Sequence, residues 1–143
     1  MTQLEKNTLR MLNANGPYEH GIWRNEKTEN TASVRNPNTM LFSARSFELL
    51  NNISNALTKI YSTHELHRLS IVDIGCYDGW VIHKLHENFN FKKAVGIEPR
   101  LKNIQKGEYA RKYYGISTNV EYIQGSIESA SKLLGHNSFD IVL

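Results

Sequence analysis

The second half of the chain alternates short apolar runs with amphipathic stretches, and this alternation constrains the fold more than any other feature. The apolar runs, rich in Val and Ile, are typical of buried strands. We predict strands at residues 69–74, 93–98, 120–124 and 139–143, and helices at residues 78–88, 101–114 and 127–134. Strand–helix alternation with short links gives parallel strands joined by right-handed crossovers. The expected fold class is therefore α/β, with a Rossmann-like, doubly wound, mainly parallel sheet and helices on both faces.

The first half follows a different pattern. Residues 1–39 are polar and interrupted by Gly and Pro, so we predict an irregular segment with a short helix near residues 3–13. Apolar residues at three- and four-residue steps predict an amphipathic helix over residues 40–61, capped by Asn38 or Thr39. The chain is expected to divide into an irregular segment (1–39), a helix packing on the core (40–68) and a partial ligand-binding domain (69–143).

Composition limits the class of protein. The 143 residues are 40% hydrophobic and 22% charged, which fits one globular domain. The net charge of +3 is spread evenly along the chain, so nucleic acid is disfavoured as a partner without being excluded. Cys76 is the only cysteine, which favours a reducing, cytoplasmic location. With no signal-peptide pattern and no long apolar run, no membrane association is expected.

Glycines and small side chains follow the first predicted strand. Gly75 and Gly79 permit a tight turn from strand to helix, with Cys76 and Tyr77 between them, so that a ligand can approach the backbone. The amides of such a turn favour an anionic group, for which the carboxylate of an amino acid would serve. In doubly wound sheets, ligands bind at the carboxyl ends of the strands.

Two acidic residues end strands at the same expected edge of the sheet. Asp73 precedes the glycine turn, where a carboxylate suits a cationic ligand better than a pyrophosphate. Glu98, followed by Pro99, ends the second strand, where an acid can accept two hydrogen bonds from ribose hydroxyls. Ser126 and Ile127 follow the third strand and would flank an adenine, at its edge and on its face.

The sequence Val72-Asp73-Ile74-Gly75-Cys76-Tyr77-Asp78-Gly79 resembles the first motif of class I S-adenosylmethionine-dependent methyltransferases. Val95-Gly96-Ile97-Glu98 is similar to their second motif, Ile123-Gln124-Gly125-Ser126 to the third, and Phe139-Asp140-Ile141-Val142-Leu143 to the fourth. The first motif departs from the family at Tyr77, where glycine is usual, and the third at Ser126, where an acid is frequent.

This resemblance implies the cofactor-binding portion of a methyltransferase that uses S-adenosylmethionine. The acceptor is not identified, and the absence of a basic stripe favours a small molecule. Family members have seven strands, so a chain that ends in the fourth is expected to be a fragment whose last strand has an exposed apolar edge. The implied cofactor-binding residues are Asp73, Gly75, Cys76, Tyr77, Gly79, Glu98, Pro99, Ser126 and Ile127.

Two other functions remain open. One is a nicotinamide-dinucleotide-binding oxidoreductase or epimerase, which the missing Gly-x-Gly-x-x-Gly pattern and the acid at Asp73 disfavour. The other is a non-catalytic cofactor-binding fragment. No catalytic residue is identified; His20 is the one candidate base, and Tyr18 and Trp23 either line the site or pack on the core.

The remaining polar residues have structural interpretations. Cys76 is expected to be a small residue in a tight place, and Asp140 a structural hydrogen-bonding group. The pairs His64/His67 and His83/His86 are interpreted as surface histidines, since no further ligands complete a metal site. The basic residues that follow the second strand are interpreted as a solvated helix face: Arg100, Lys102, Lys106, Arg111 and Lys112.

Overall fold

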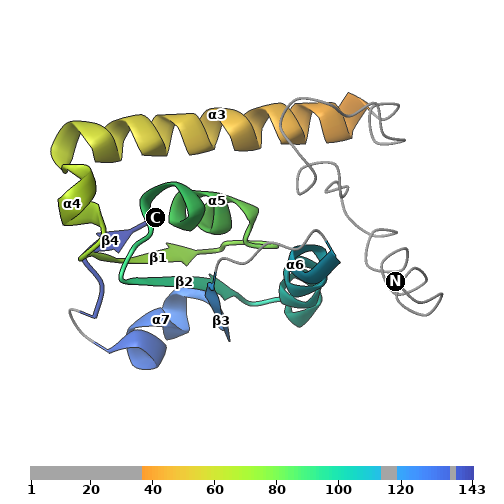
Figure 1. The fold of residues 1–143 in the computed structure, drawn as a ribbon. Helices are drawn as coiled ribbons and strands as arrows, with labels where there is room; N and C mark the ends of the chain where they lie inside the picture. Colours follow the sequence, from red (N-terminus) through yellow and green to blue (C-terminus); the bar gives the residue numbers. More distant parts are fainter. Residues whose placement is uncertain (1–36, 114–118, 136–137) are drawn as a thin grey trace.

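The computed structural model describes residues 37–113, 119–135 and 138–143 (Figure 1). Side chains are described from residue 46 onward within these ranges, except at residues 109, 110, 112 and 113. The predicted helix near residues 3–13 and the aromatic residues Tyr18, His20 and Trp23 lie outside the described residues.

Four parallel strands form one sheet in the order β3-β2-β1-β4. They are β1 (Ser70–Ile74), β2 (Lys93–Glu98), β3 (Glu121–Gln124) and β4 (Ile141–Val142). The chain builds outward from β1 to β3 and then crosses to the other side of β1, so the strand order reverses beside β1. The sheet confirms the predicted α/β, doubly wound fold and brings the carboxyl ends of all four strands to one edge.

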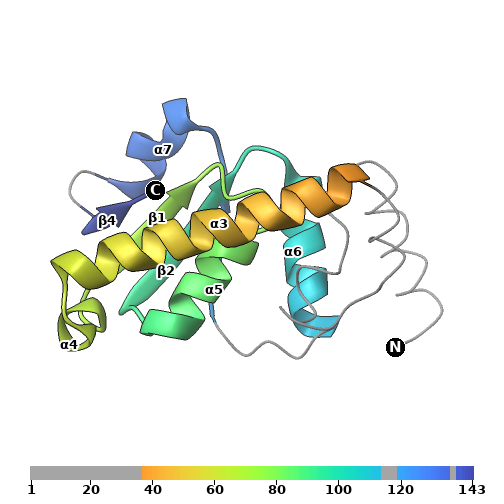
Figure 2. The same ribbon diagram turned by 90° about the horizontal axis from the view of Figure 1, so that it is seen from above.

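Helices cover both faces of the sheet (Figure 1). On one face α5 (Trp80–Phe89) packs against the strands, with α6 (Leu101–Tyr113) beside it, and α3 (Pro37–Ile60) crosses over α5 as a further layer (Figure 2). The opposite face carries α7 (Ile127–Leu134), and the short α4 (Thr63–Leu66) leads from α3 into β1. The strand β2 and the helix α7 have the bounds that the sequence predicts.

Alternation along the strands produces two apolar clusters. Ile71 and Ala94, which are paired in register, face α5. Their neighbours Val72 and Val95, also paired, face α7 together with Ile97. Both sides of β1 and β2 are therefore buried, which explains why these strands read as nearly continuous apolar runs.

The helix α3 packs on the core through its apolar face. The rings of Phe47 and Trp80 meet edge to face with centroids 4.9 Å apart. The helix begins at Pro37, so the prediction that Asn38 or Thr39 caps it is wrong. Proline is well suited to the first helical position, because its fixed φ is helical and it lacks an amide that would need a partner there. The division of the chain at residues 39 and 68 stays a prediction.

The strand β4 lies at one edge of the described sheet and pairs with β1 alone. Its Val142 side chain is exposed. Just before β4, Asp140 Oδ2 accepts a hydrogen bond of 2.7 Å from the Ser70 amide, which confirms the structural role predicted for this acid. Among the described residues, no helix is long and apolar enough to cross a membrane.

Candidate functional site

The turn between β1 and α5 has an unusual backbone. Gly75, Tyr77 and Gly79 have φ values of 87°, 58° and 78°, all in the left-handed region. Glycine adopts this region freely, whereas a tyrosine there is strained by about 1–2 kcal/mol. Gly79 is also closely packed, because an added Cβ would lie within 3 Å of the Tyr122 ring. The predicted glycine turn is therefore present, with a tyrosine held at its centre.

The amides of this turn already have partners within the protein. Gly75 N and Cys76 N both donate to the Ile97 carbonyl, at 2.8 and 3.0 Å, and Tyr77 N donates to Glu98 Oε2 at 3.2 Å. These three amides are therefore not open to the anionic group that the sequence suggested. At the start of α5, Trp80 N donates to Asp78 Oδ1 at 3.2 Å, so a carboxylate already occupies the end of the helix.

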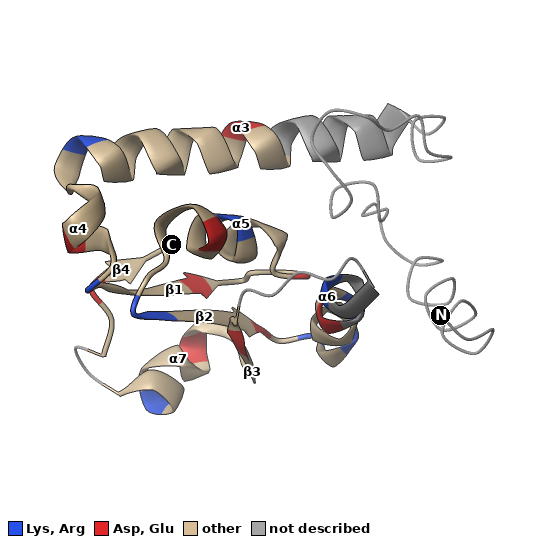
Figure 3. Cartoon of the chain, viewed as in Figure 1, with Lys and Arg blue, Asp and Glu red and all other residues tan. Residues whose placement is uncertain are grey.

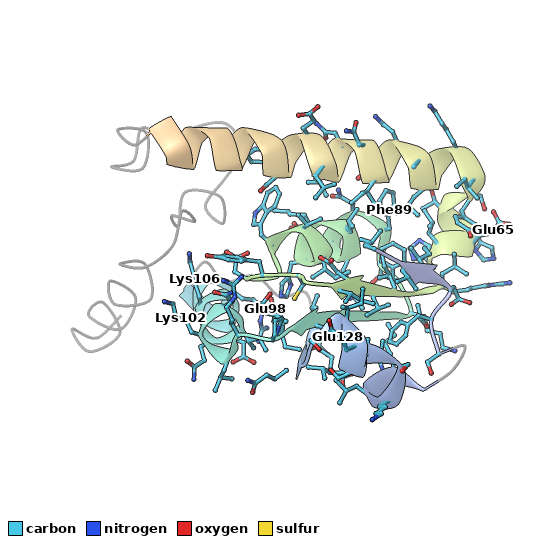
Figure 4. The ribbon with its side chains drawn as sticks, turned by 180° about the vertical axis from the view of Figure 1, so that it is seen from behind. Glu65, Phe89, Glu98, Lys102, Lys106 and Glu128 are labelled. Atoms are coloured by element: carbon cyan, nitrogen blue, oxygen red, sulfur yellow. The ribbon has the colours of Figure 1, made fainter. Side chains whose placement is uncertain are left out.

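The Glu98 side chain accepts hydrogen bonds from three other residues at this edge. It ends β2 and is 2% exposed. Its Oε1 accepts hydrogen bonds from Arg100 N at 3.1 Å, Arg100 Nε at 3.0 Å and Asn103 Nδ2 at 2.9 Å. With Tyr77 N on Oε2, one carboxylate links the turn after β1 to the start of α6 (Figure 4).

Among the described residues, Arg100 and Lys106 each place a cation over the Tyr77 ring. The Arg100 guanidinium carbon and Lys106 Nζ are each 5.6 Å from the ring centroid. Lys106 is 2% exposed, although it was expected on a solvated face of the helix. That interpretation is wrong for Lys106 because α6 packs beside the turn, so its inward face meets Tyr77 instead of water.

Asp73 differs from Glu98 in that no charged partner among the described residues offsets its burial. It is half-buried near the end of β1, and burial raises its pKa from 3.8 to about 6. An acid of this kind is stabilised in its charged form by a cation placed next to it. The acidic position on β1 and basic positions on α6 flank this end of the sheet (Figure 3).

The third strand end is joined to the second. Gln124 pairs in register with Glu98, and Gly125 N donates to the Glu98 carbonyl at 3.2 Å. Ser126 precedes α7 and its hydroxyl interacts with Glu128, whose pKa it lowers. Ile127 is 70% exposed at the start of that helix. The structure thus brings Asp73, the glycine turn, Glu98 and Ser126 to one edge, with Pro99 and Ile127 exposed beside them.

Other predicted residues have structural positions. Cys76 is buried against Gly96, and burial raises the pKa of its thiol, so it is a small packed residue as expected. His64 and His67 are exposed, also as expected. His83, however, is 1% exposed, and burial lowers its pKa to about 3, so the prediction of a surface histidine is wrong there.

Among the described residues, no cluster of His, Cys, Asp and Glu could hold a metal ion. A separate open pocket of about 280 Å³ lies between the sheet and α7. Its lining is mostly apolar and includes Val72, Ile74, Leu134 and Phe139, but none of the predicted site residues.

Sequence reasoning missed two residues that shape the site. Asn103 reaches Glu98 from α6, and Tyr122 of β3 donates to the Asp78 carbonyl at 2.9 Å. The only sequence signal for Asn103 is its position five residues after Glu98, in the first turn of the next helix. No local pattern reveals Tyr122, because its partner is far away in the chain.

No protein-family model and no curated protein sequence matches the chain. Solved structures do. A protein assigned as a sarcosine dimethylglycine methyltransferase, from Galdieria sulphuraria, matches with a TM-score of 0.53 and 16% identity over 95% of this chain and 47% of its own. The bifunctional kinase–methyltransferase WbdD matches with a TM-score of 0.50 and 21% identity over 94% of this chain and 27% of its own.

A methyltransferase from Thiobacillus denitrificans, solved with S-adenosylhomocysteine, has a TM-score of 0.46 and 13% identity over 99% of this chain and 42% of its own. The chain therefore spans less than half the length of these three proteins. At such low identities the likeness is one of fold.

Proposed function

We propose that this chain, which has the fold of class I S-adenosylmethionine-dependent methyltransferases, binds S-adenosylmethionine at the carboxyl ends of β1, β2 and β3. The observation that carries the proposal is the pair of acids at this edge. Glu98 is buried and held beside the turn after β1, and Asp73 is half-buried without a charged partner in the described part of the chain that offsets its burial.

Each acid suits a different part of the cofactor. Asp73 would stabilise the ammonium group, because a cation next to this carboxylate compensates for the burial that raises its pKa to about 6. Glu98 would accept the ribose hydroxyls. Ser126 and Ile127 are proposed to border the adenine, with Pro99 beside the ribose; the exposed face of Ile127 supports an apolar contact.

The proposed reaction is transfer of a methyl group to a small-molecule acceptor. When bound, the cofactor would supply an electrophilic methyl carbon, and its sulfur would leave as a neutral thioether that needs no protonation. The task of the protein is then to hold the two reactants in line, which can contribute up to about 7–11 kcal/mol. Asp73 and Glu98 would fix the position of the cofactor, because Asp73 would bind its ammonium group and Glu98 its ribose. Transfer to an acceptor is a separate proposal from cofactor binding, because the chain spans less than half of the solved methyltransferases.

The arrangement at the start of α5 argues against a nicotinamide dinucleotide. In dinucleotide-binding folds the pyrophosphate lies at the amino terminus of this helix. Here the Asp78 carboxylate accepts from Trp80 N at that position, and the amides of the turn are bonded elsewhere. A pyrophosphate would meet a negative charge with few free donors.

Isothermal titration with S-adenosylhomocysteine tests the proposal. We expect the unaltered chain to bind, and Glu98→Gln to weaken binding at least about tenfold, because hydrogen bonds to a charged acceptor are lost. The matched control is Glu121→Gln, since Glu121 is an exposed acid of β3 that pairs with Lys93. Equal affinities for Glu98→Gln and the unaltered chain, or binding of NADH in place of S-adenosylhomocysteine, would reject the assignment.

A further inference from the structure

The Arg100 side chain contacts both Glu98, the proposed ribose acceptor, and Tyr77 of the turn after β1. Its Nε donates to Glu98 Oε1 at 3.0 Å while its guanidinium carbon lies 5.6 Å from the centroid of the Tyr77 ring. The Arg100 side chain is 68% exposed, whereas Glu98 is buried beneath it. Arg100 and Tyr77 together form a cover over the carboxylate, called here the Arg100–Tyr77 cover.

The carboxylate has little capacity left for a ligand. A carboxylate offers about four acceptor positions, two on each oxygen. Oε1 already receives three donors and Oε2 receives one. One ribose hydroxyl could take the position left on Oε2, but Oε1 has none left, so the second hydroxyl can bond only by replacing one of its three donors.

Arg100 Nε is the donor that can leave at least cost. The Arg100 amide and the Asn103 side chain are held in place where β2 leads into α6, and the Tyr77 amide belongs to the turn. The Arg100 guanidinium alone sits on a flexible, exposed side chain.

Tyr77 can keep its position when Arg100 moves. Lys106 Nζ also lies 5.6 Å from the ring centroid, and Lys106 is buried in α6. The ring therefore has a second, fixed cation. Tyr77 is the stationary part of the cover and Arg100 the movable part.

We infer that the Arg100 guanidinium competes with the ribose of the cofactor for Glu98, and that it thereby sets the cofactor affinity. This inference rests on the proposed function. It assigns a specific cost to cofactor binding: the exposed ion pair with Glu98 and the cation–π contact with Tyr77 must both be given up.

Calorimetric titration of variants with S-adenosylhomocysteine tests the inference. We expect Arg100→Ala to bind about 3- to 10-fold more tightly than the unaltered chain, because the two exposed interactions no longer compete. Arg100→Met, which keeps the aliphatic stem without the charge, should behave alike. Lys102→Ala is the control, since it removes a neighbouring exposed cation of α6 and should leave the affinity unchanged (Figure 4).

A second measurement follows Arg100 directly. We expect the NMR signal of Arg100 Nε–H to show a hydrogen bond in the free chain and to lose it when S-adenosylhomocysteine saturates the protein. If both Arg100 variants bind no more tightly than the unaltered chain while Glu98→Gln binds poorly, the competition is rejected and the proposed function stands. If the unaltered chain does not bind, or Glu98→Gln binds normally, the proposed function and the inference fail together.

Discussion

Gly107 lies where α6 touches the turn after β1, and its replacement by alanine is a sharp test of the structure. An added Cβ would lie 1.9 Å from the Asp78 carbonyl oxygen and 3.0 Å from the Tyr122 hydroxyl. In the interior of a helix, alanine is normally favoured over glycine by about 1 kcal/mol. Local propensity therefore predicts that Gly107→Ala stabilises the protein, whereas the packing predicts the opposite.

The size of the effect follows from the short distance. A carbon and a carbonyl oxygen ordinarily approach to about 3.3 Å, so α6 would have to move by roughly 1.4 Å. The obstacle is backbone and cannot rotate away. Overpacking of this kind costs about 3 kcal/mol at the upper end of its usual range. After the gain in helix propensity, we expect Gly107→Ala to lower the free energy of unfolding by about 2 kcal/mol.

Urea denaturation measures this difference. The control is the pair Gln105→Ala and Gln105→Gly, at an exposed position of the same helix, where alanine should be the more stable by about 1 kcal/mol. The shift should also weaken S-adenosylhomocysteine binding, because α6 carries Asn103 and Lys106. A Gly107→Ala variant more stable than the unaltered chain would refute the close packing of α6 on the turn.

Three further outcomes are expected. Asp73 has a pKa raised from 3.8 to about 6, so in this window the folded chain holds a proton that the unfolded chain has released, and this acid makes stability fall as the pH rises. The free energy of unfolding of Asp73→Asn, relative to that of the unaltered chain, should therefore rise by about 1–3 kcal/mol between pH 4 and pH 7 in urea titrations. A difference that stays constant with pH would contradict the burial of this acid. Tyr77→Gly should be more stable than Tyr77→Ala by about 1 kcal/mol, because only alanine is strained at a φ of 58°; the reverse order would exclude that backbone. Cys76 should react with iodoacetamide far more slowly in the folded chain than in urea, since burial raises the thiol pKa, and equal rates would show that it is accessible.

In the unaltered chain, a second buried group masks part of the contribution of Asp73 to the pH dependence of stability. His83 has a pKa lowered to about 3, so it makes stability fall as the pH drops below about 6.5, where the unfolded chain takes up a proton first. Asp73 acts in the opposite direction over much of the same range. The two contributions offset each other, which is why the comparison with Asp73→Asn is needed.

The parts of the fold that the sequence predicted well are those with local signals. The strand β2 and the helix α7 begin and end at the predicted residues because apolar runs and a glycine stop mark their ends. The four strand ends could be placed on one edge because parallel topology requires it. The start of α3 at Pro37 differs from the predicted start at residue 40, because proline breaks a helix in its interior but is favoured in its first turn.

The environment of the site was harder to predict. The spacing of His83 and Lys106 shows which helix face they share but not what lies against that face. α5 is covered by the sheet on one side and by α3 and α6 on others, so a histidine that reads as a surface residue is buried. The hydrogen bonds to Glu98 likewise come from three places: the turn after β1, the loop after β2 and the helix α6. No single sequence motif contains all of these donors.

The central position of β1 has a consequence for how the chain acquires its structure during synthesis. One edge of β1 can pair with β2 as soon as residue 98 is available, but the other edge waits for β4, whose residues follow about 70 positions later. Closing so long a loop is slow compared with hairpin or helix formation. For that interval a growing chain presents an open strand edge that is a template for pairing with other chains, so nascent copies would be most prone to associate before residue 141 emerges.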